Sequence, residues 1–260
     1  MTTTDPSTKD AELALLEMVE AKRAETADAN RADAVALQHG LGKLTARERV
    51  SYLLDDDSFD EIGSLVEPRR DTVPLADLEA PADGLVAGYG TIAGRPVGIV
   101  ASDFTVHGGG FSTMGGLKVE AVAQHCLRNG VPLIQLHDSG GHRIQEALES
   151  RHSASGTGNW MKFSTQARMS GWVPMVNAIL GPGFAGPSNF SALADFTVMV
   201  RGLSTMGAAG PALVKQATGE DKGSQELGGA EIQVDQNGVA ELGVDGEHEA
   251  LDSMRRFLSY

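Results

Sequence analysis

The stretch that decides the fold is residues 131–146, VPLIQLHDSGGHRIQE. Its first six residues form an apolar run of strand length, which passes directly into the polar and glycine-rich residues 137–141. A short apolar run that ends in a glycine turn is typical of a buried strand. Glycine at such a place indicates a tight turn or a backbone that a ligand approaches closely. We therefore predict a buried strand over 131–136, followed by a turn with a functional role.

The same unit recurs downstream. Residues 175–180 form a second strand-like run that ends in the glycine turn 181–187, GPGFAGP, and a short helix around 188–194 and a strand at 196–200 follow. Other short elements surround these two units. Strands are predicted at 85–89 and 97–102, joined as a hairpin, and helices at 212–218 and 248–258. Strands that alternate with glycine turns and helices indicate an α/β fold with right-handed crossovers.

Three helical patterns come from residue spacing. Residues 11–38 contain no Gly or Pro and predict one long helix, whose thin apolar stripe (Leu13, Leu16, Val19) should lie on another surface. Residues 43–50 start a second helix, because Thr45 and the glutamate three residues later form a capping-box pattern. The aspartates at 55–57 end it and are interpreted as a solvated turn. The third helix is indicated by apolar residues at helical spacing over 119–127. Cys126 lies on its apolar face, and we expect it to pack in the core.

Composition excludes several classes of protein. The chain has 260 residues, with 35 acidic and 21 basic side chains, so the formal net charge is −14. Nucleic-acid binding requires clustered excess Lys and Arg, so it is not expected as the main function. No apolar run has the length of a membrane span, and residues 1–10 are polar and lack the apolar region of a secretory signal. A single cysteine excludes a disulfide framework and cysteine-based metal sites, and no other metal site is proposed. We expect a cytoplasmic globular protein.

The two glycine turns suggest a chemistry. Backbone N–H groups at the start of a helix are unpaired and can face an anion or a developing oxyanion. If the turns converge, each can donate one N–H to a thioester carbonyl and stabilise its enolate. The candidate donors are Gly140, Gly141, Ala185 and Gly186. Pro187 has no N–H to donate. The alternative is that both segments are ordinary tight turns.

Charged and titratable residues near the first turn are further candidates. Possible bases are His137, Asp138, His142 and Glu146. The sequence gives no geometry to choose among them, and most residues of these types cap a helix or face solvent. Groups that could hold phosphates by charge are Lys118, Arg143, Lys162 and Arg168. For Lys118 and Arg143 the alternative is a salt bridge to a nearby carboxylate.

Several of these motifs resemble those of one family. Residues 43–49 (KLTARER), 83–90 (DGLVAGYG) and 138–146 (DSGGHRIQE) are similar to motifs of the carboxyltransferase subunits of biotin-dependent acyl-CoA carboxylases, of the propionyl-CoA carboxylase beta-chain type. Residues 195–200 (DFTVMV) and the segment 218–230 also match that pattern. The resemblance runs from about Lys43 to Tyr260 and corresponds to the N-terminal half of family members.

The resemblance implies a crotonase-like (ClpP/crotonase) fold, a β-superhelix with flanking helices. We expect this domain over 41–260 and an N-terminal helical extension over 1–40. It further implies an acyl-CoA thioester as substrate, bound at an oxyanion hole formed by the two glycine turns, with Lys118, His142 and Arg143 as candidate substrate-binding residues. The implied reaction moves CO2 from carboxybiotin, carried on another protein, to the α-carbon of the acyl-CoA, so that no side-chain base is required.

Because only the N-terminal half is matched, the resemblance implies partner chains. These are a chain with the C-terminal half, a biotin carboxyl carrier or biotin carboxylase chain, and further copies in an oligomer. The chain is then an incomplete enzyme alone, as a split subunit or as a piece of a longer protein. Pro187, His142 and a longer segment over 148–160 depart from the family pattern. They leave two alternatives open: a CoA-dependent decarboxylase or lyase, with His142 or Glu146 as acid, and a non-catalytic binding subunit.

Overall fold

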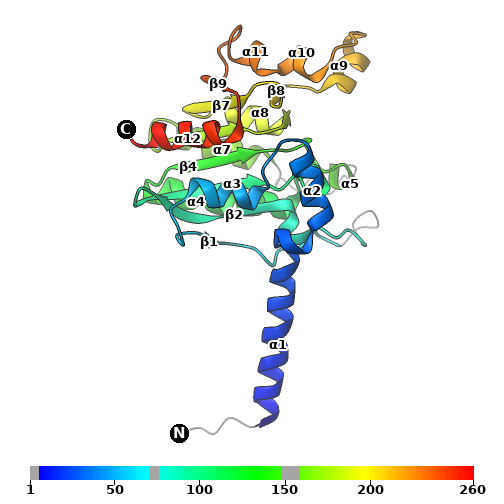
Figure 1. The fold of residues 1–260 in the computed structure, drawn as a ribbon, viewed down its shortest axis with the longest axis vertical. Coiled ribbons are helices and arrows are strands. Elements are labelled where there is room, and N and C mark those ends of the chain that lie inside the picture. The colour runs from blue at the N-terminus through cyan, green and yellow to red at the C-terminus, as the bar shows by residue number, and fades with distance from the viewer. Residues whose placement is uncertain (1–5, 71–75, 148–158) are drawn as a thin grey trace.

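A twisted sheet forms the centre of the molecule. The computed structural model describes residues 6–70, 76–147 and 159–260, and in this part of the chain seven strands form the main sheet, in the order β1-β2-β3-β4-β5-β7-β9 (Figure 1). The pairs from β3 to β9 are parallel, and β1, β2 and β3 pair antiparallel. The strands are β1 Asp60–Glu61, β2 Leu85–Ile92, β3 Arg95–Ser102, β4 Leu133–His137, β5 Met175–Ile179, β7 Phe196–Val200 and β9 Leu242–Val244.

The five predicted strands are confirmed as β2, β3, β4, β5 and β7, and the short strands β1 and β9 of the main sheet were not predicted. The hairpin of β2 and β3 turns over Ala93 and Gly94, both with positive φ, as a two-residue hairpin turn requires. The second glycine turn contains a short strand that was not predicted. This strand, β6 (Pro182–Phe184), pairs with β8 (Thr205–Gly207) in a small second sheet. The second glycine turn is therefore held in place by the hydrogen bonds between β6 and β8.

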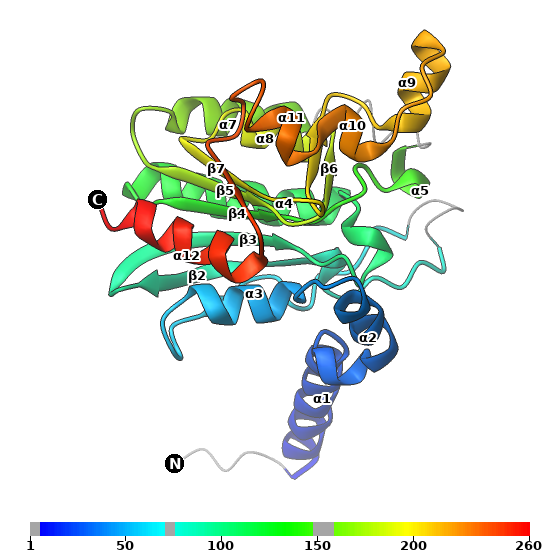
Figure 2. The ribbon, with the colours of Figure 1, turned by 45° about the horizontal axis from the view of Figure 1, so that its top comes forward.

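Two helices cover each face of the main sheet. On one face, α3 (Ala46–Leu53) and α12 (Glu247–Leu258) lie against each other and bury apolar side chains on the strands (Figure 2). On the other face, α4 (Thr113–Asn129) packs against α7 (Asn159–Met169), and Cys126 of α4 is fully buried there, as predicted. The apolar spacing along α4 thus corresponds to its buried face.

The remaining helices lie around the sheets. After the second glycine turn come α8 (Gly186–Ser191), α9 (Pro211–Thr218), α10 (Ser224–Gly228) and α11 (Ala230–Gln233). The short elements η3 (Pro81–Gly84), η4 (His107–Gly109) and α5 (Ile144–Ala147) lie in loops. Within the described residues, every helix is too short or too polar to cross a lipid bilayer.

The prediction of one helix over 11–38 is wrong. The structure has α1 (Pro6–Glu25), the single turn η1 (Asp28–Asn30) and α2 (Ala32–Gly40) in its place. The guanidinium of Arg31 bonds the Thr26 carbonyl at 3.0 Å and ion-pairs with Asp103 at 2.9 Å, and these contacts hold the break. Figure 1 shows α1 projecting from the body of the molecule. Its leucines Leu13 and Leu16 are exposed, so within the described residues the apolar stripe is not covered by another surface, contrary to the prediction.

The start of the second helix is confirmed and its end is corrected. Thr45 caps α3, and the capping box with Glu48 is complete. Asp55 is more than a solvated residue, because its carboxylate accepts hydrogen bonds from the Thr91 hydroxyl and from the Ala93 and Gly94 N–H groups. It thereby closes the turn between β2 and β3.

Candidate functional site

The two glycine turns meet at one edge of the main sheet. They follow β4 and β5, which are neighbouring parallel strands, so both turns lie at the same edge. The Ser139 N–H donates to the Pro182 carbonyl at 2.8 Å. A Cβ placed on Gly141 would lie 3.9 Å from the Phe184 carbonyl oxygen. The convergence on which the proposed chemistry depends is therefore present.

Of the four candidate donors, two have their N–H groups occupied by the chain itself. The Gly140 N–H donates to the Gly108 carbonyl at 3.0 Å, and the Ala185 N–H to the Gly207 carbonyl at 2.8 Å. The Gly141 N–H has only a 3.2 Å contact with the Ser139 hydroxyl. Within residues 6–70, 76–147 and 159–260, nothing accepts a hydrogen bond from the Gly186 N–H. The donors open to a ligand are therefore Gly141, in the first turn, and Gly186, in the second.

A third segment, residues 107–111, completes the site, and sequence reasoning did not assign it a role. Gly109 has a φ of +64°, and a Cβ there would lie 2.2 Å from the Asp138 carbonyl oxygen. Only glycine allows this loop to lie so close to the first turn. The Phe111 N–H then donates to the Gly141 carbonyl at 2.7 Å. The glycine cluster at 108–110 was the signal for this contact.

Asp138, a candidate base, is a structural anion. It is fully buried, and its carboxylate contacts the Lys43 ammonium at 2.5 Å, the Arg49 guanidinium at 2.9 Å and the Gln38 amide at 3.0 Å. A Cβ on Gly181 would lie 2.2 Å from the same carboxylate, so the second turn is built around it. Asp138 thus ties the entry segment of the chain to both glycine turns.

Arg143 and Glu146 form a second buried cluster. The Arg143 guanidinium ion-pairs with Asp83 and, at 3.1 Å, with Glu146. The Glu146 carboxylate also accepts a hydrogen bond from the Thr113 N–H at 2.7 Å, at the start of α4. All three charged side chains are buried. Of the two roles considered for Arg143, the salt bridge is the one present, and Glu146 is held as its partner.

Lys118 also points into the protein. Its ammonium donates to the Ala82 carbonyl at 3.0 Å and to the Leu85 carbonyl, and burial lowers the pKa of this amine to about 8. It holds the turn that carries Asp83, which has a positive φ of 53°. Lys118 is therefore placed to support the Arg143 cluster, and its ammonium faces carbonyl groups instead of solvent.

The other candidates have different surroundings. His137 is buried, its ring stacks on Phe190, and burial lowers the pKa of its imidazole to about 3. It is therefore neutral at pH 7 and shielded from solvent. His142 is exposed and follows Gly141 at the site, and Arg168 is exposed on α7. The Lys162 side chain and most of the segment 148–160 lie outside the described residues.

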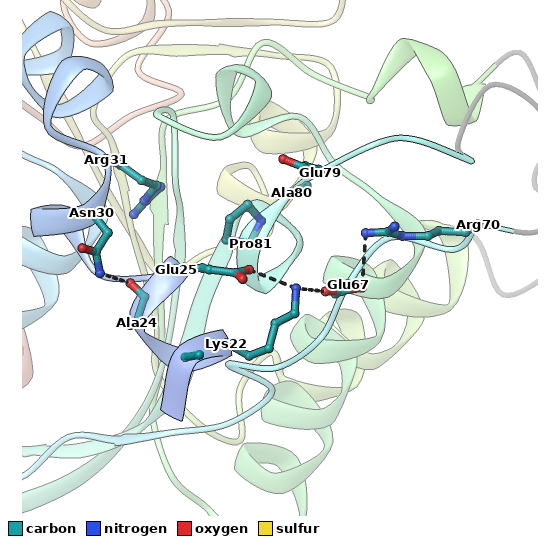
Figure 3. Close-up of a pocket in the computed structure, with 11 residues that line it drawn as sticks. Lys22, Ala24, Glu25, Asn30, Arg31, Glu67, Arg70, Glu79, Ala80 and Pro81 are labelled. Carbon is teal, nitrogen blue, oxygen red and sulfur yellow. Dashed lines mark hydrogen bonds and ion pairs between the residues drawn. The ribbon is translucent and has the colours of Figure 1, made fainter. Parts of the chain in front are cut away.

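A cavity of about 620 Å³ lies elsewhere, under the end of α1 (Figure 3). Its basic side chains are already paired: Lys22 with Glu25 at 3.1 Å and with Glu67 at 2.9 Å, and Arg70 with Glu67 at 3.3 Å. Basic groups that are neutralised in this way offer little charge to a phosphate. We therefore place the candidate site at the glycine turns and not at this cavity.

The fold and the site define a class of protein. Residues 37–260 match the family model described as the carboxyl transferase domain, and this chain belongs to that family. The structure of transcarboxylase 12S with hydrolysed methylmalonyl-coenzyme A bound superimposes with a TM-score of 0.84 and 35% sequence identity, over 100% of this chain and 49% of that one. The expected crotonase-like fold is confirmed.

Two relatives of known activity are similar in sequence to this chain. The carboxyltransferase subunit of propionyl-CoA carboxylase from Haloferax mediterranei is 40% identical over 92% of this chain and 45% of its own length. The alpha subunit of methylmalonyl-CoA decarboxylase from Veillonella parvula is 38% identical over 87% of this chain and 43% of its own length. The chain thus spans about half the length of the relatives it matches, as the resemblance to an N-terminal half predicted.

Proposed function

We propose that this chain supplies the acyl-CoA-binding half of a biotin-dependent acyl-CoA carboxyltransferase. In this reaction CO2 moves from carboxybiotin to the α-carbon of an acyl-CoA. The proposal depends above all on one observation: two glycine turns meet, and in the described part of the chain no group accepts from the Gly186 N–H, which lies beside the weakly held Gly141 N–H. Two such donors suit the oxygen of a thioester as it becomes an enolate.

The two N–H donors fit this chemistry because a hydrogen bond becomes stronger as the acceptor oxygen gains negative charge. A thioester oxygen gains negative charge when the α-proton leaves, and fixed N–H groups stabilise that charge without reorganisation. Gly186 is the first residue of α8, at the positive end of that short helix. We propose Gly141 and Gly186 as the donors; Gly140 and Ala185 shape the turns through their own hydrogen bonds.

Three of the four candidate bases are held inside the protein, which supports a mechanism without a protein base; the fourth, His142, is exposed. Asp138 and Glu146 are held in buried ion pairs, and His137 is buried and neutral. Carboxybiotin, when bound, supplies the CO2 and a ring nitrogen that can accept the α-proton. The role of this chain is then to bind the thioester, to orient its carbonyl and to stabilise the enolate oxygen.

The proposal includes partners, because the chain spans about half of its relatives. We propose a second chain that carries the C-terminal half, a biotinylated carrier, and assembly into an oligomer. The transcarboxylase 12S structure is described as a hexamer, which supports the oligomer. The biotin site is assigned mainly to the second chain, and a cytoplasmic location belongs to the same proposal.

Paired substitutions at Gly186 test the donor role. Gly186→Pro removes the N–H at a first helical position, where proline is tolerated. Gly186→Ala keeps the N–H, and its Cβ would lie 3.5 Å from Phe111, an ordinary contact. The measurement is the dissociation constant of propionyl-CoA and of propyl-CoA, the thioether that lacks the carbonyl oxygen.

We expect the wild-type chain and Gly186→Ala to bind the thioester more tightly than the thioether. One hydrogen bond is worth about 0.5–1.5 kcal/mol, which corresponds to a preference of roughly two- to tenfold. Gly186→Pro should show a smaller preference, because only the Gly141 N–H remains, while its thermal unfolding stays cooperative. A proline variant that folds and keeps the full preference would contradict the donor assignment.

A second candidate is decarboxylation of an acyl-CoA at the same donors. The observation that favours it is the likeness to the Veillonella decarboxylase subunit. A decarboxylase that acts alone needs a side-chain acid, and of the two proposed, Glu146 is buried against Arg143. His142→Ala separates the alternatives, because it should abolish turnover by such an enzyme and leave carboxyl transfer in the reconstituted complex in place. A non-catalytic binding subunit would bind the thioester but give no carboxyl transfer in the reconstituted complex.

A further inference from the structure

We infer that Phe111 is a specificity-determining residue that restricts the acyl group to short chains. This inference rests on the proposed function, since it concerns the acyl-CoA held at Gly141 and Gly186. The ring of Phe111 lies at the place where the two donors meet, and it comes from a segment that neither glycine turn includes. The argument uses its backbone bonds, its ring contacts and the side chains behind it.

The backbone of Phe111 is bonded to the first turn on both sides. Its N–H donates to the Gly141 carbonyl at 2.7 Å, and its carbonyl accepts from the Arg143 N–H at 2.8 Å. These bonds make a short parallel bridge between Phe111 and His142. Because Arg143 is anchored by the buried Asp83 and Glu146, the bridge cannot shift without disturbing that cluster. The position of Phe111 relative to Gly141 is therefore fixed.

The ring of Phe111 reaches the second turn. A Cβ on Gly186 would lie 3.5 Å from Cε2 and 3.6 Å from Cδ2 of this ring. The residue thus links the two donors, with its backbone on one and its ring against the other. The residue is only partly buried, so part of it remains exposed to solvent. On this inference, an oxygen bound by both N–H groups places its acyl carbon near the ring.

The ring has firm support behind it. Its centroid lies 5.9 Å from that of Phe190, at an angle of 48°. Phe190 is 1% exposed and stacks on Phe163 at 4.5 Å and on the ring of His137. Close-packed interiors leave little room for a side chain to withdraw. A longer acyl chain would therefore meet a ring that cannot move back, whereas a short one ends before it.

The test compares acyl-chain preference in matched variants. Phe111→Ala removes the ring, and Phe111→Leu retains an apolar side chain of smaller reach. The control is Phe257→Leu in α12, on another part of the molecule. It shortens a half-buried ring that stacks on Phe196 of β7. Dissociation constants are measured by calorimetry for free CoA, acetyl-CoA, propionyl-CoA and octanoyl-CoA, with thermal unfolding of each variant recorded alongside.

We expect the wild-type chain and Phe257→Leu to bind propionyl-CoA at least tenfold more tightly than octanoyl-CoA. Phe111→Ala should reduce this ratio tenfold or more by strengthening octanoyl-CoA binding, with free CoA unchanged and Phe111→Leu intermediate. The inference is overturned if the ratio is the same in all variants, or if Phe111→Ala weakens every ligand equally, free CoA included. If the wild-type chain binds acyl-CoA but the Phe111 variants have the same ratio, this inference alone is refuted. If the wild-type chain binds no CoA ligand, the proposed function is refuted as well.

Discussion

The charge of Asp138 sets the stability of the site. Its carboxylate lies between Lys43 and Arg49 with all three groups buried, so Asp138→Asn leaves the Lys43 ammonium without its carboxylate partner, while Arg49 keeps Glu247 at 2.6 Å. Breaking a buried ion pair from one side costs about 3–5 kcal/mol, because the remaining charge stays desolvated. We expect a loss of this size in the free energy of unfolding, measured by urea denaturation.

An exposed aspartate provides the matched control. Asp235 pairs with Arg201 at 2.7 Å on the surface, and Asp235→Asn makes the same chemical change there. Exposed pairs contribute little, so the urea midpoint of this variant should stay at the wild-type value. Equal effects of the two substitutions would show that Asp138 is not the buried anchor described above.

The buried His137 makes the fold sensitive to acid. Its imidazole has a pKa of about 3 in the folded chain against 6.5 when exposed, so between these values the unfolded chain binds the extra proton. Stability is then highest above pH 6.5 and falls as the pH drops toward 3, by about 1.4 kcal/mol per pH unit from this group.

Two histidine variants isolate this effect from that of the carboxylates. His137→Gln should unfold with a shallower dependence on pH between 6.5 and 3 than the wild-type chain, measured by urea denaturation at each pH. His248→Gln, which removes an exposed histidine of α12, should follow the wild-type curve. Parallel curves for all three proteins would contradict the assignment to His137.

At the level of single residues, the sequence indicates where the site lies but not which atoms act. Glycine beside an apolar run was enough to locate both turns. The Gly140 and Ala185 N–H groups are nevertheless occupied, by carbonyls of Gly108 and Gly207. Those carbonyls come from distant segments, and no local pattern reports on them. In the same way, Arg143 is neutralised by Asp83, a residue far away in the sequence.

At the level of elements, the strands β2, β3, β4, β5 and β7 and the helix α4 were predictable because their apolar patterns are local. The break between α1 and α2 was not, because residues 26–31 contain no Gly or Pro. It is held by long-range contacts instead. Arg31 reaches Asp103, and Arg47 of α3 donates to the Thr26 carbonyl at 2.8 Å. Tertiary ion pairs here override a helical propensity that the sequence plainly has.

The isolated position of α1 gives a prediction about its leucines. Leu16 is 52% exposed, whereas Leu53 of α3 is fully buried between the helix and the sheet. Leu16→Ala should change the free energy of unfolding by less than about 0.5 kcal/mol, and Leu53→Ala should cost about 2–5 kcal/mol. Both are measured by urea denaturation at micromolar protein concentration.

The urea denaturation of the wild-type protein and Leu16→Ala is repeated at tenfold higher protein concentration, as a second measurement. If copies of the chain associate through α1, the wild-type protein gains stability with concentration and Leu16→Ala loses that gain. A loss above about 2 kcal/mol for Leu16→Ala at the lowest concentration would contradict the view that this chain leaves α1 uncovered.

At the level of the whole molecule, the fold presents one edge of the sheet with an open pair of donors. Three segments build that edge: the two glycine turns and the loop with Phe111. Two buried clusters, around Asp138 and around Arg143, hold the segments together. In the proposed function, this edge binds a thioester and polarises its carbonyl. Among the described residues it brings no accessible, unpaired carboxylate to take a proton.

This division of labour predicts how activity should depend on a second chain. The isolated protein should bind propionyl-CoA but transfer no CO2. Adding a chain with the C-terminal half of a relative, such as the Haloferax subunit, together with a biotinylated carrier should produce transfer, because the carrier then has its site. The measurement is transfer of labelled carboxyl from methylmalonyl-CoA to biotin. Reconstitution with Gly186→Pro should fall about 10²–10³-fold below the wild-type rate, the usual cost of one oxyanion donor. Transfer by the isolated chain at the reconstituted rate would refute the assignment as a half enzyme, since the donors described here would then suffice alone.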